Sequence, residues 1–195
     1  MKKMILAASL VCIAGLAHAV ESPKWDMVQL GYLSVDLDDD ISFDGFGIAG
    51  SKLLGENVFI MGAYGRLSED VDVVGDSVDL DYTPLSVGLG VRHPVAPNID
   101  IFGVVSYEDV ELKASYSGDS DSVSDNGYGF SAGVRAMVIP SLELSGSLNY
   151  INMEESETGF GVSAHYYFTD QFSLGAGYSK SDDVDGTSLV ASFYF

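Results

Sequence analysis

The side chains best suited to chemistry in this sequence are carboxylates that gather in short runs. One run holds Asp38, Asp39 and Asp40, and another near the carboxyl end holds Asp182, Asp183 and Asp185. Clustered carboxylate oxygens are ligands that a hard divalent cation such as Ca²⁺ accepts. Neither run follows the residue order of an EF-hand, and a run of like charges is usually a solvated surface. We therefore expect a solvated, repulsive acidic surface by default, with a weak and diffuse association with divalent cations as the alternative, and no defined metal site.

The first nineteen residues have the three parts of a secretory signal peptide. Lys2 and Lys3 form a positive head, an apolar stretch covers residues 4–16, and Ala17-His18-Ala19 is a small-x-small cleavage site. The apolar stretch is shorter than the roughly 20 residues of a membrane-spanning helix. We expect cleavage after Ala19, leaving one domain over residues 20–195. The only cysteine, Cys12, would leave with the signal, so no disulfide or thiolate chemistry would remain.

The charge of the chain excludes one class of partner. It carries 29 acidic and 9 basic residues, for a net charge of −20, which rules out nucleic-acid binding by phosphate neutralisation. Such an acidic chain can be disordered, but hydrophobic residues make up 47% of this one. The charges must therefore be segregated from the apolar residues.

Apolar residues alternate with small or polar ones from end to end, which is the period of a β-strand. In residues 186–195, Leu189 and Phe193 would face one way and Ser188 and Ser192 the other. We expect ten strands, near residues 27–35, 45–53, 59–67, 85–92, 99–113, 128–138, 142–150, 160–168, 172–179 and 186–195. The range 99–113 begins almost continuously apolar, so its facing is ambiguous. Eight strands are the alternative.

The less apolar face of these strands distinguishes a membrane protein from a soluble one. A soluble β-sandwich would carry Lys, Glu, Thr and Asp there, whereas this face is mainly Gly and Ser with single charges. Small side chains suit the interior of a narrow closed barrel. Closure also pairs every backbone group, which hydrocarbon requires. We predict an all-β fold, a closed antiparallel up-and-down transmembrane barrel.

A few polar side chains would then point into the lumen of the barrel. The predicted lumenal polar network comprises Tyr64, Arg66, Arg92, Arg135, Glu143 and His165. Because a buried charge must be paired, we expect ion pairs and hydrogen bonds that plug the lumen. Glu143 would pair with Arg135 across a turn at Pro140. A narrow water-filled path between the same residues is the alternative.

The connections between the strands differ on the two sides of the barrel. The short ones cover 54–56, 93–98, 140 and 169–171, and the longer, acidic ones cover 36–44, 68–79, 114–126, 152–157 and 180–186. Short periplasmic turns and long outer loops are typical of such barrels. Both termini would then be periplasmic, and the outer mouth would carry a concentrated negative field.

The chain resembles the small outer-membrane β-barrel proteins of Gram-negative bacteria. The residues that carry the resemblance are the Ala17-His18-Ala19 site, Tyr128-Gly129-Phe130-Ser131-Ala132-Gly133 and the terminal Phe193-Tyr194-Phe195. This group includes the OmpA membrane domain, the OmpX/Ail-type proteins and the opacity-type porin superfamily. The resemblance implies an outer-membrane location and recognition of the strand ending at Phe195 by the assembly machinery. It also implies contact with lipid and lipopolysaccharide. Divalent cations could then bridge the acidic loops and the lipopolysaccharide phosphates.

Some barrels of this size are enzymes, and those place a histidine at the outer rim. Here His93 and His165 are expected at the periplasmic end, so we expect neither an enzyme nor a cofactor. We interpret the chain as a monomeric outer-membrane barrel with acidic extracellular loops and a structural or surface-interaction role. A narrow, cation-preferring channel for small solutes is the alternative.

Overall fold

The computed structural model describes residues 22–37, 41–73, 76–116, 119–181 and 184–195. They form ten strands: β1 (Met27–Leu37), β2 (Ile41–Leu53), β3 (Val58–Val73), β4 (Asp76–Ala96), β5 (Ile99–Tyr116), β6 (Asp119–Ile139), β7 (Leu142–Asn152), β8 (Ser156–Tyr167), β9 (Phe172–Lys180) and β10 (Val184–Tyr194). Within these residues no helix is long and apolar enough to cross a membrane. The expected signal peptide lies outside the described residues, as do Asp38, Asp39, Asp40, Asp182 and Asp183.

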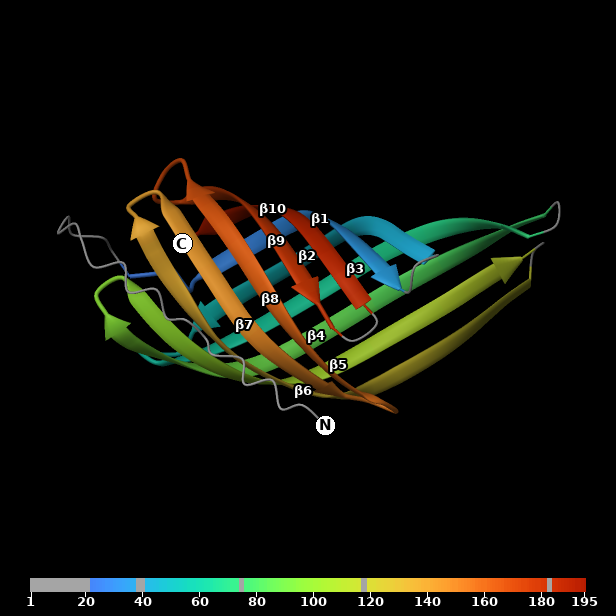
Figure 1. Cartoon of the computed structure of the whole chain (residues 1–195), viewed down its shortest axis with the longest axis horizontal. Helices are drawn as coiled ribbons and strands as arrows, with labels where there is room; N and C mark the ends of the chain where they lie inside the picture. Colours follow the sequence, from blue (N-terminus) through green and yellow to red (C-terminus); the bar gives the residue numbers. More distant parts are fainter. Residues whose placement is uncertain (1–21, 38–40, 74–75, 117–118, 182–183) are drawn as a thin grey trace, which may run out of the picture.

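Each strand pairs antiparallel with its neighbour in the chain, and β1 pairs with β10 to close the barrel (Figure 1). The closing register runs from Met27 opposite Tyr194 to Leu37 opposite Val184. The predicted closed antiparallel barrel is therefore confirmed, and ten strands hold in place of the alternative eight. The sheet has no open edge along this seam, as the hydrocarbon of a membrane demands.

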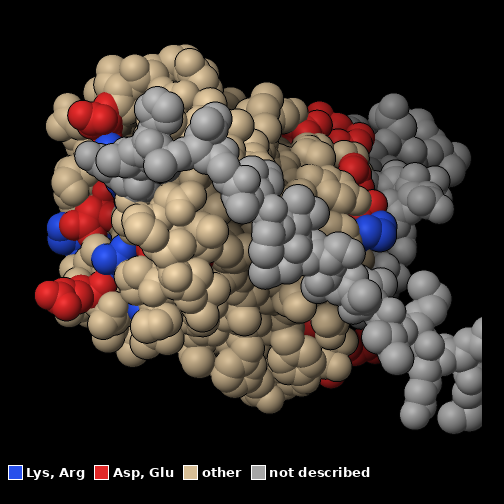
Figure 2. Space-filling view, turned by 60° about the vertical axis from the view of Figure 1, so that its left-hand side comes forward, with Lys and Arg blue, Asp and Glu red and all other residues tan. Residues whose placement is uncertain are grey.

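The outer wall of the barrel is apolar. Leu30, Phe46, Leu148 and Leu189 each expose more than three-fifths of their surface, at 62%, 73%, 68% and 64%. On the face presented in Figure 2, acidic and basic side chains gather at the two ends, with a band of other residues between them. An apolar surface of this extent on a folded chain needs a nonaqueous surrounding.

The facing of β3 is the opposite of the prediction. Phe59 and Leu67, expected outside, are 2% and 1% exposed and point inward. Tyr64 and Arg66, expected in the lumen, lie on the outer wall, where Arg66 pairs with the outward Phe46 of β2. The prediction failed because β3 carries large apolar residues on both faces. Alternation alone cannot decide which face of such a strand is buried.

The structure also resolves the ambiguous phase of β5. Asp100, Val104 and Ser106 are buried and face the lumen, whereas Val105 and Tyr107 are exposed on the outer wall. Both faces begin with apolar residues because Phe102 and Val104 pack inside the lumen while Ile101 and Val105 face outward. Asp100 is the one charged residue at the start of this inward face, and it is fully buried.

The predicted long acidic loops are largely strand. β2 pairs with β3 only as far as Ser68, and β7 pairs with β6 only as far as Tyr128. Beyond these points β3–β6 continue as a four-stranded sheet, which Figure 1 shows projecting past the other strands. We call residues 69–73, 76–80, 108–116 and 119–127 the acidic extension. Both described termini lie at the opposite end, where the backbone N–H of Phe195 donates to the carbonyl of Asp26 over 3.2 Å.

Glycines of the inner wall make room for aromatic rings on the neighbouring strands. Gly90 lies opposite Phe59, Gly133 opposite Phe102, and Gly175 opposite His165. A Cβ on Gly133 would lie 2.6 Å from the Phe102 ring, and one on Gly90 would overlap the Phe59 ring. These rings thus occupy part of the lumen, at positions where the neighbouring strand has no side chain.

We predict that Gly90→Ala destabilises the barrel by about 1–3 kcal/mol, because the Phe59 ring is buried and cannot yield without displacing its neighbours. The matched control is Gly103→Ala on the outer wall, where a Cβ would meet nothing closer than 3.8 Å. Urea unfolding of each variant in lipid vesicles measures the difference. Equal stability of the two variants would contradict this packing.

Candidate functional site

The segment before β1, residues 22–26, folds across the lumen at the end where the termini lie. Its Trp25 is 5% exposed and is the only tryptophan of the chain. The indole packs on Phe59 of β3 with ring centroids 4.5 Å apart, and edge-on against Phe102 of β5 at 5.7 Å. Val104 completes this cluster. We call residues 22–26 the N-terminal segment.

Asp100 of β5 anchors this segment to the wall. Its side chain is fully buried, and its Oδ2 accepts a 2.7 Å hydrogen bond from Nε1 of Trp25. Nη1 of Arg92 donates to the same oxygen over 3.0 Å, and the Ser22 hydroxyl lies 3.4 Å from both carboxylate oxygens. A buried carboxylate with a charged partner and further donors is fully compensated.

A second buried ion pair lies beside the first. Nε and Nη2 of Arg135 donate to the two oxygens of Glu143, over 2.6 and 3.1 Å, across the turn that contains Pro140. The Tyr167 hydroxyl donates to Oε2 of Glu143 over 2.7 Å. Arg135 also holds the N-terminal segment, because its Nη2 donates to the Lys24 carbonyl over 2.8 Å and its guanidinium lies 4.5 Å from the Trp25 ring.

The structure brings four of the six predicted lumenal residues together. Arg92, Arg135, Glu143 and His165 lie inside the barrel near the terminal end. Tyr64 and Arg66 do not join them, for the reason given for β3. Trp25 and Asp100 also belong to the site but were not among the predicted residues. A lone tryptophan just before the first strand was a usable signal, whereas Asp100 was hidden by the ambiguous phase of β5.

His165 has a distinct environment. Its ring lies over Gly175, and in the strand register it faces Glu143. Its Nδ1 is buried and has no hydrogen-bond partner among the described residues. The His165 side chain lines a lumen cavity of about 250 Å³.

Trp25 and Tyr194 separate two cavities. On the lumen side they line the 250 Å³ cavity, and on the terminal side they line a pocket of about 470 Å³ together with Lys24 and Phe195. A third cavity of about 420 Å³ continues the lumen toward the acidic extension. It shares Arg135 and Phe102 with the 250 Å³ cavity. The lumen is therefore a series of cavities that is closed at the terminal end.

Asp26 ends the segment and ties it to β2. Partial burial opposes its ionisation, but the N–H of Leu53 and the ammonium of Lys52 outweigh that effect and hold the pKa of Asp26 below its usual range. A lowered pKa means that this tie stabilises the fold at neutral pH. The contribution falls as the pH drops through the pKa of Asp26.

The carboxylate runs do not form a metal site in the part of the chain that the structure describes. No group of three or more His, Cys, Asp or Glu side chains is placed there to hold a metal ion. Of the predicted loop ligands only Asp185 is described, and both of its oxygens accept hydrogen bonds from Lys180, over 2.8 and 3.0 Å.

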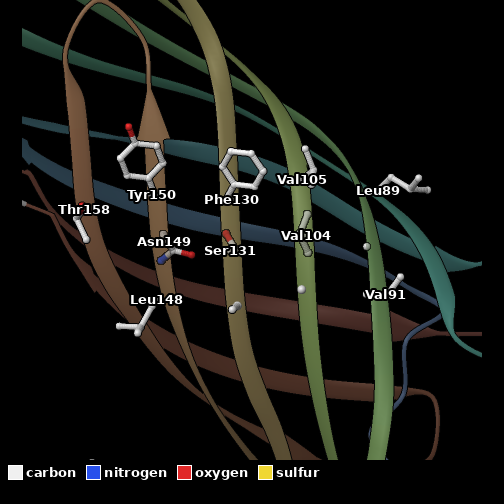
Figure 3. A pocket seen from close by; sticks show the side chains of 13 residues that line it. Leu89, Val91, Val104, Val105, Phe130, Ser131, Leu148, Asn149, Tyr150 and Thr158 are labelled. Carbon is white, nitrogen blue, oxygen red and sulfur yellow. The ribbon is translucent and has the colours of Figure 1, made fainter.

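The outer wall carries one further hollow, across β4–β8 (Figure 3). Its volume is about 610 Å³, and its exposed rim includes Leu89, Val91, Phe130 and Leu148. The lining is largely aliphatic and aromatic, with Ser131, Asn149 and Thr158 as its polar members, so it suits the acyl chains of surrounding lipid rather than a polar ligand.

We predict that Glu143→Gln destabilises the barrel by about 3–5 kcal/mol, because it leaves the buried charge of Arg135 without a counter-charge. Lys52→Gln, which removes an exposed pair with Asp26, is the control and costs less than about 1 kcal/mol. Denaturant unfolding in vesicles compares the two. A Glu143→Gln variant as stable as the control would show that the Arg135–Glu143 pair makes no net contribution to the free energy of unfolding.

The comparisons with known proteins agree with this geometry. The chain shares the fold of the NanC porin, at 8% identity and a TM-score of 0.52, covering 86% of this chain and 98% of that one. It also matches Ail, the attachment invasion locus protein of Yersinia pestis, at 16% identity and a TM-score of 0.45, covering 86% and 94% of the two chains. No match was found among curated protein sequences. Residues 4–157 match the outer membrane protein beta-barrel domain, and the chain belongs to that family.

Proposed function

We propose that this protein is a closed, non-catalytic barrel of the Gram-negative outer membrane that presents the acidic extension to the outside as an interaction surface. The barrel provides the anchor, and the extension provides the contact with other molecules. Both termini and the short turns would face the periplasm. The lumen, closed by the N-terminal segment and the two buried ion pairs, would carry no solute in this state.

The acidic extension is the observation that carries the proposal. Four strands continue beyond their neighbours, so both edges of this sheet and its outer face are free of other strands. Asp79, Glu111, Asp119 and Asp121 are exposed there, and Lys113 is the nearest base on the paired strands. Acidic residues along an exposed edge also oppose uncontrolled strand pairing. A surface so charged attracts cationic groups.

The chemistry of this surface defines the partners that we propose. Divalent cations would associate diffusely with the carboxylates and would be shared with lipopolysaccharide phosphates. At the other end, the exposed Phe193 and Phe195 of the terminal strand would be read by the outer-membrane assembly machinery. The apolar wall contacts lipid over its whole circumference, so one copy is sufficient for insertion.

Orientation can be tested by labelling single cysteines, because the processed chain is expected to contain none. We predict that Ser122→Cys in the acidic extension reacts with a membrane-impermeant maleimide on intact cells. Pro97→Cys, in the β4–β5 turn, should react only after the outer membrane is permeabilised. Both residues are exposed, so access alone decides the result. Labelling of Pro97→Cys but not Ser122→Cys on intact cells would overturn the orientation.

The interaction surface can be tested with an oligolysine peptide. We predict binding to the purified barrel that weakens as salt rises and is reduced severalfold in the double variant Asp119→Asn, Asp121→Asn. The matched double variant Glu56→Gln, Asp170→Asn removes the same charge at the terminal end and should bind like the parent. Equal loss in both variants would mean that the extension is not the binding surface.

A further inference from the structure

We propose that the N-terminal segment is a stopper, and that the barrel conducts small cations when this segment leaves the lumen. The proposal goes beyond the proposed function, which requires only that the lumen be closed. It rests on how the cavities are arranged, on what holds the segment, and on what remains in the wall once the segment is gone.

The cavities form a path that Trp25 interrupts. The 420 Å³ cavity is lined by hydroxyl groups and glycines of β7–β10, including Ser147, Ser179 and Ser188, and by apolar side chains such as Leu33 and Phe102. It adjoins the 250 Å³ cavity at Arg135. Between that cavity and the 470 Å³ terminal pocket stand the indole of Trp25 and the ring of Tyr194. Removing the indole joins the last two cavities.

The segment is held by side-chain contacts and not by a strand ladder. The pairing of β1 with β2 and β10 begins at Met27, one residue after the segment ends. Residues 22–25 are held through Asp100, Arg135, the hydroxyl of Ser51 and the carbonyl of Asp170. Residues 22–25 can therefore leave without breaking any strand pairing, while Asp26 keeps its contacts with Phe195, Lys52 and Leu53.

The wall remains electrostatically satisfied when the segment leaves. Asp100 keeps its ion pair with Arg92 at 3.0 Å, and Arg135 keeps both of its bonds to Glu143. No buried charge loses its counter-charge, so the large penalty for opening a buried ion pair does not apply.

The opened path favours cations. The two wall arginines are each neutralised by a carboxylate, and the serine hydroxyls along the wider cavity can solvate an ion of either sign. The acidic extension at the far mouth raises the local concentration of cations and lowers that of anions. Phe43 and Leu67 fill part of the lumen below the extension, so the path runs along the hydroxyl-lined side.

The test is the conductance of the full chain, exported and purified from outer membranes, in planar bilayers with a KCl gradient. We expect the parent to be silent and Trp25→Ala to show stable, cation-selective steps. The ionic current per barrel should rise about tenfold or more, because loss of a large buried side chain shifts a closed–open equilibrium by at least that factor. Trp25→Phe keeps an aromatic ring in place and should remain close to silent.

Heat-modifiable migration on gels shows that each variant is folded. A second variant that lacks residues 22–25 removes the stopper entirely and protects the test against a local effect of the alanine. If both variants are folded and silent, the stopper proposal fails while the closed barrel of the proposed function stands. If the parent already conducts as strongly as Trp25→Ala, the closed barrel itself is wrong.

Discussion

The structure depends on one constraint: inside hydrocarbon, every backbone N–H and C=O must find a partner within the protein. Pairing of β1 with β10 meets that demand by closing the sheet, and closure fixes the width of the lumen. A lumen of fixed width must then be filled or hydrated. The chain fills part of it with rings such as Phe59 and Phe102, which lie over glycines on the adjacent strands. The inner-wall glycines are thus explained by packing and not by backbone flexibility.

Filling the lumen also explains where the buried charges lie. Asp100 and Glu143 are 0% and 1% exposed, and each faces an arginine from a neighbouring strand. Both pairs lie near the terminal end, where short turns hold the strands together, and neither lies at mid-barrel. Ion pairs at this level close the lumen without placing a charge in contact with lipid. The acidic residues of the extension lie on strands, and the ion pairs near them, Arg66 with Asp81 and Lys180 with Asp185, are more exposed.

The alternation of residues predicts the fold well where one face is made of Gly and Ser. β6 and β10 are of this kind, and their faces lie as expected. The Arg135–Glu143 contact was also predictable, because two opposite charges flank a short turn. β3 was not, since Phe59 is as apolar as its outward neighbour Ile60. Phe59 faces inward because it packs on Trp25, which lies on a segment outside the strands. The alternation of residues within β3 cannot predict that contact.

The acidic segments between the predicted strands could not be recognised as strands from their sequence. Runs of Asp and Ser are poor strand formers in isolation, so the sequence predicts loops where the structure extends β3–β6. The strands persist because each pairs with a neighbour along its length, from Val73 opposite Asp76 to Tyr116 opposite Asp119. The mechanical link to the lumen is then direct: these strands carry Phe59, Asp100 and Arg135 at their other ends. A partner bound to the extension would act on the same four strands that hold the N-terminal segment, which places the interaction surface and the stopper on one continuous sheet.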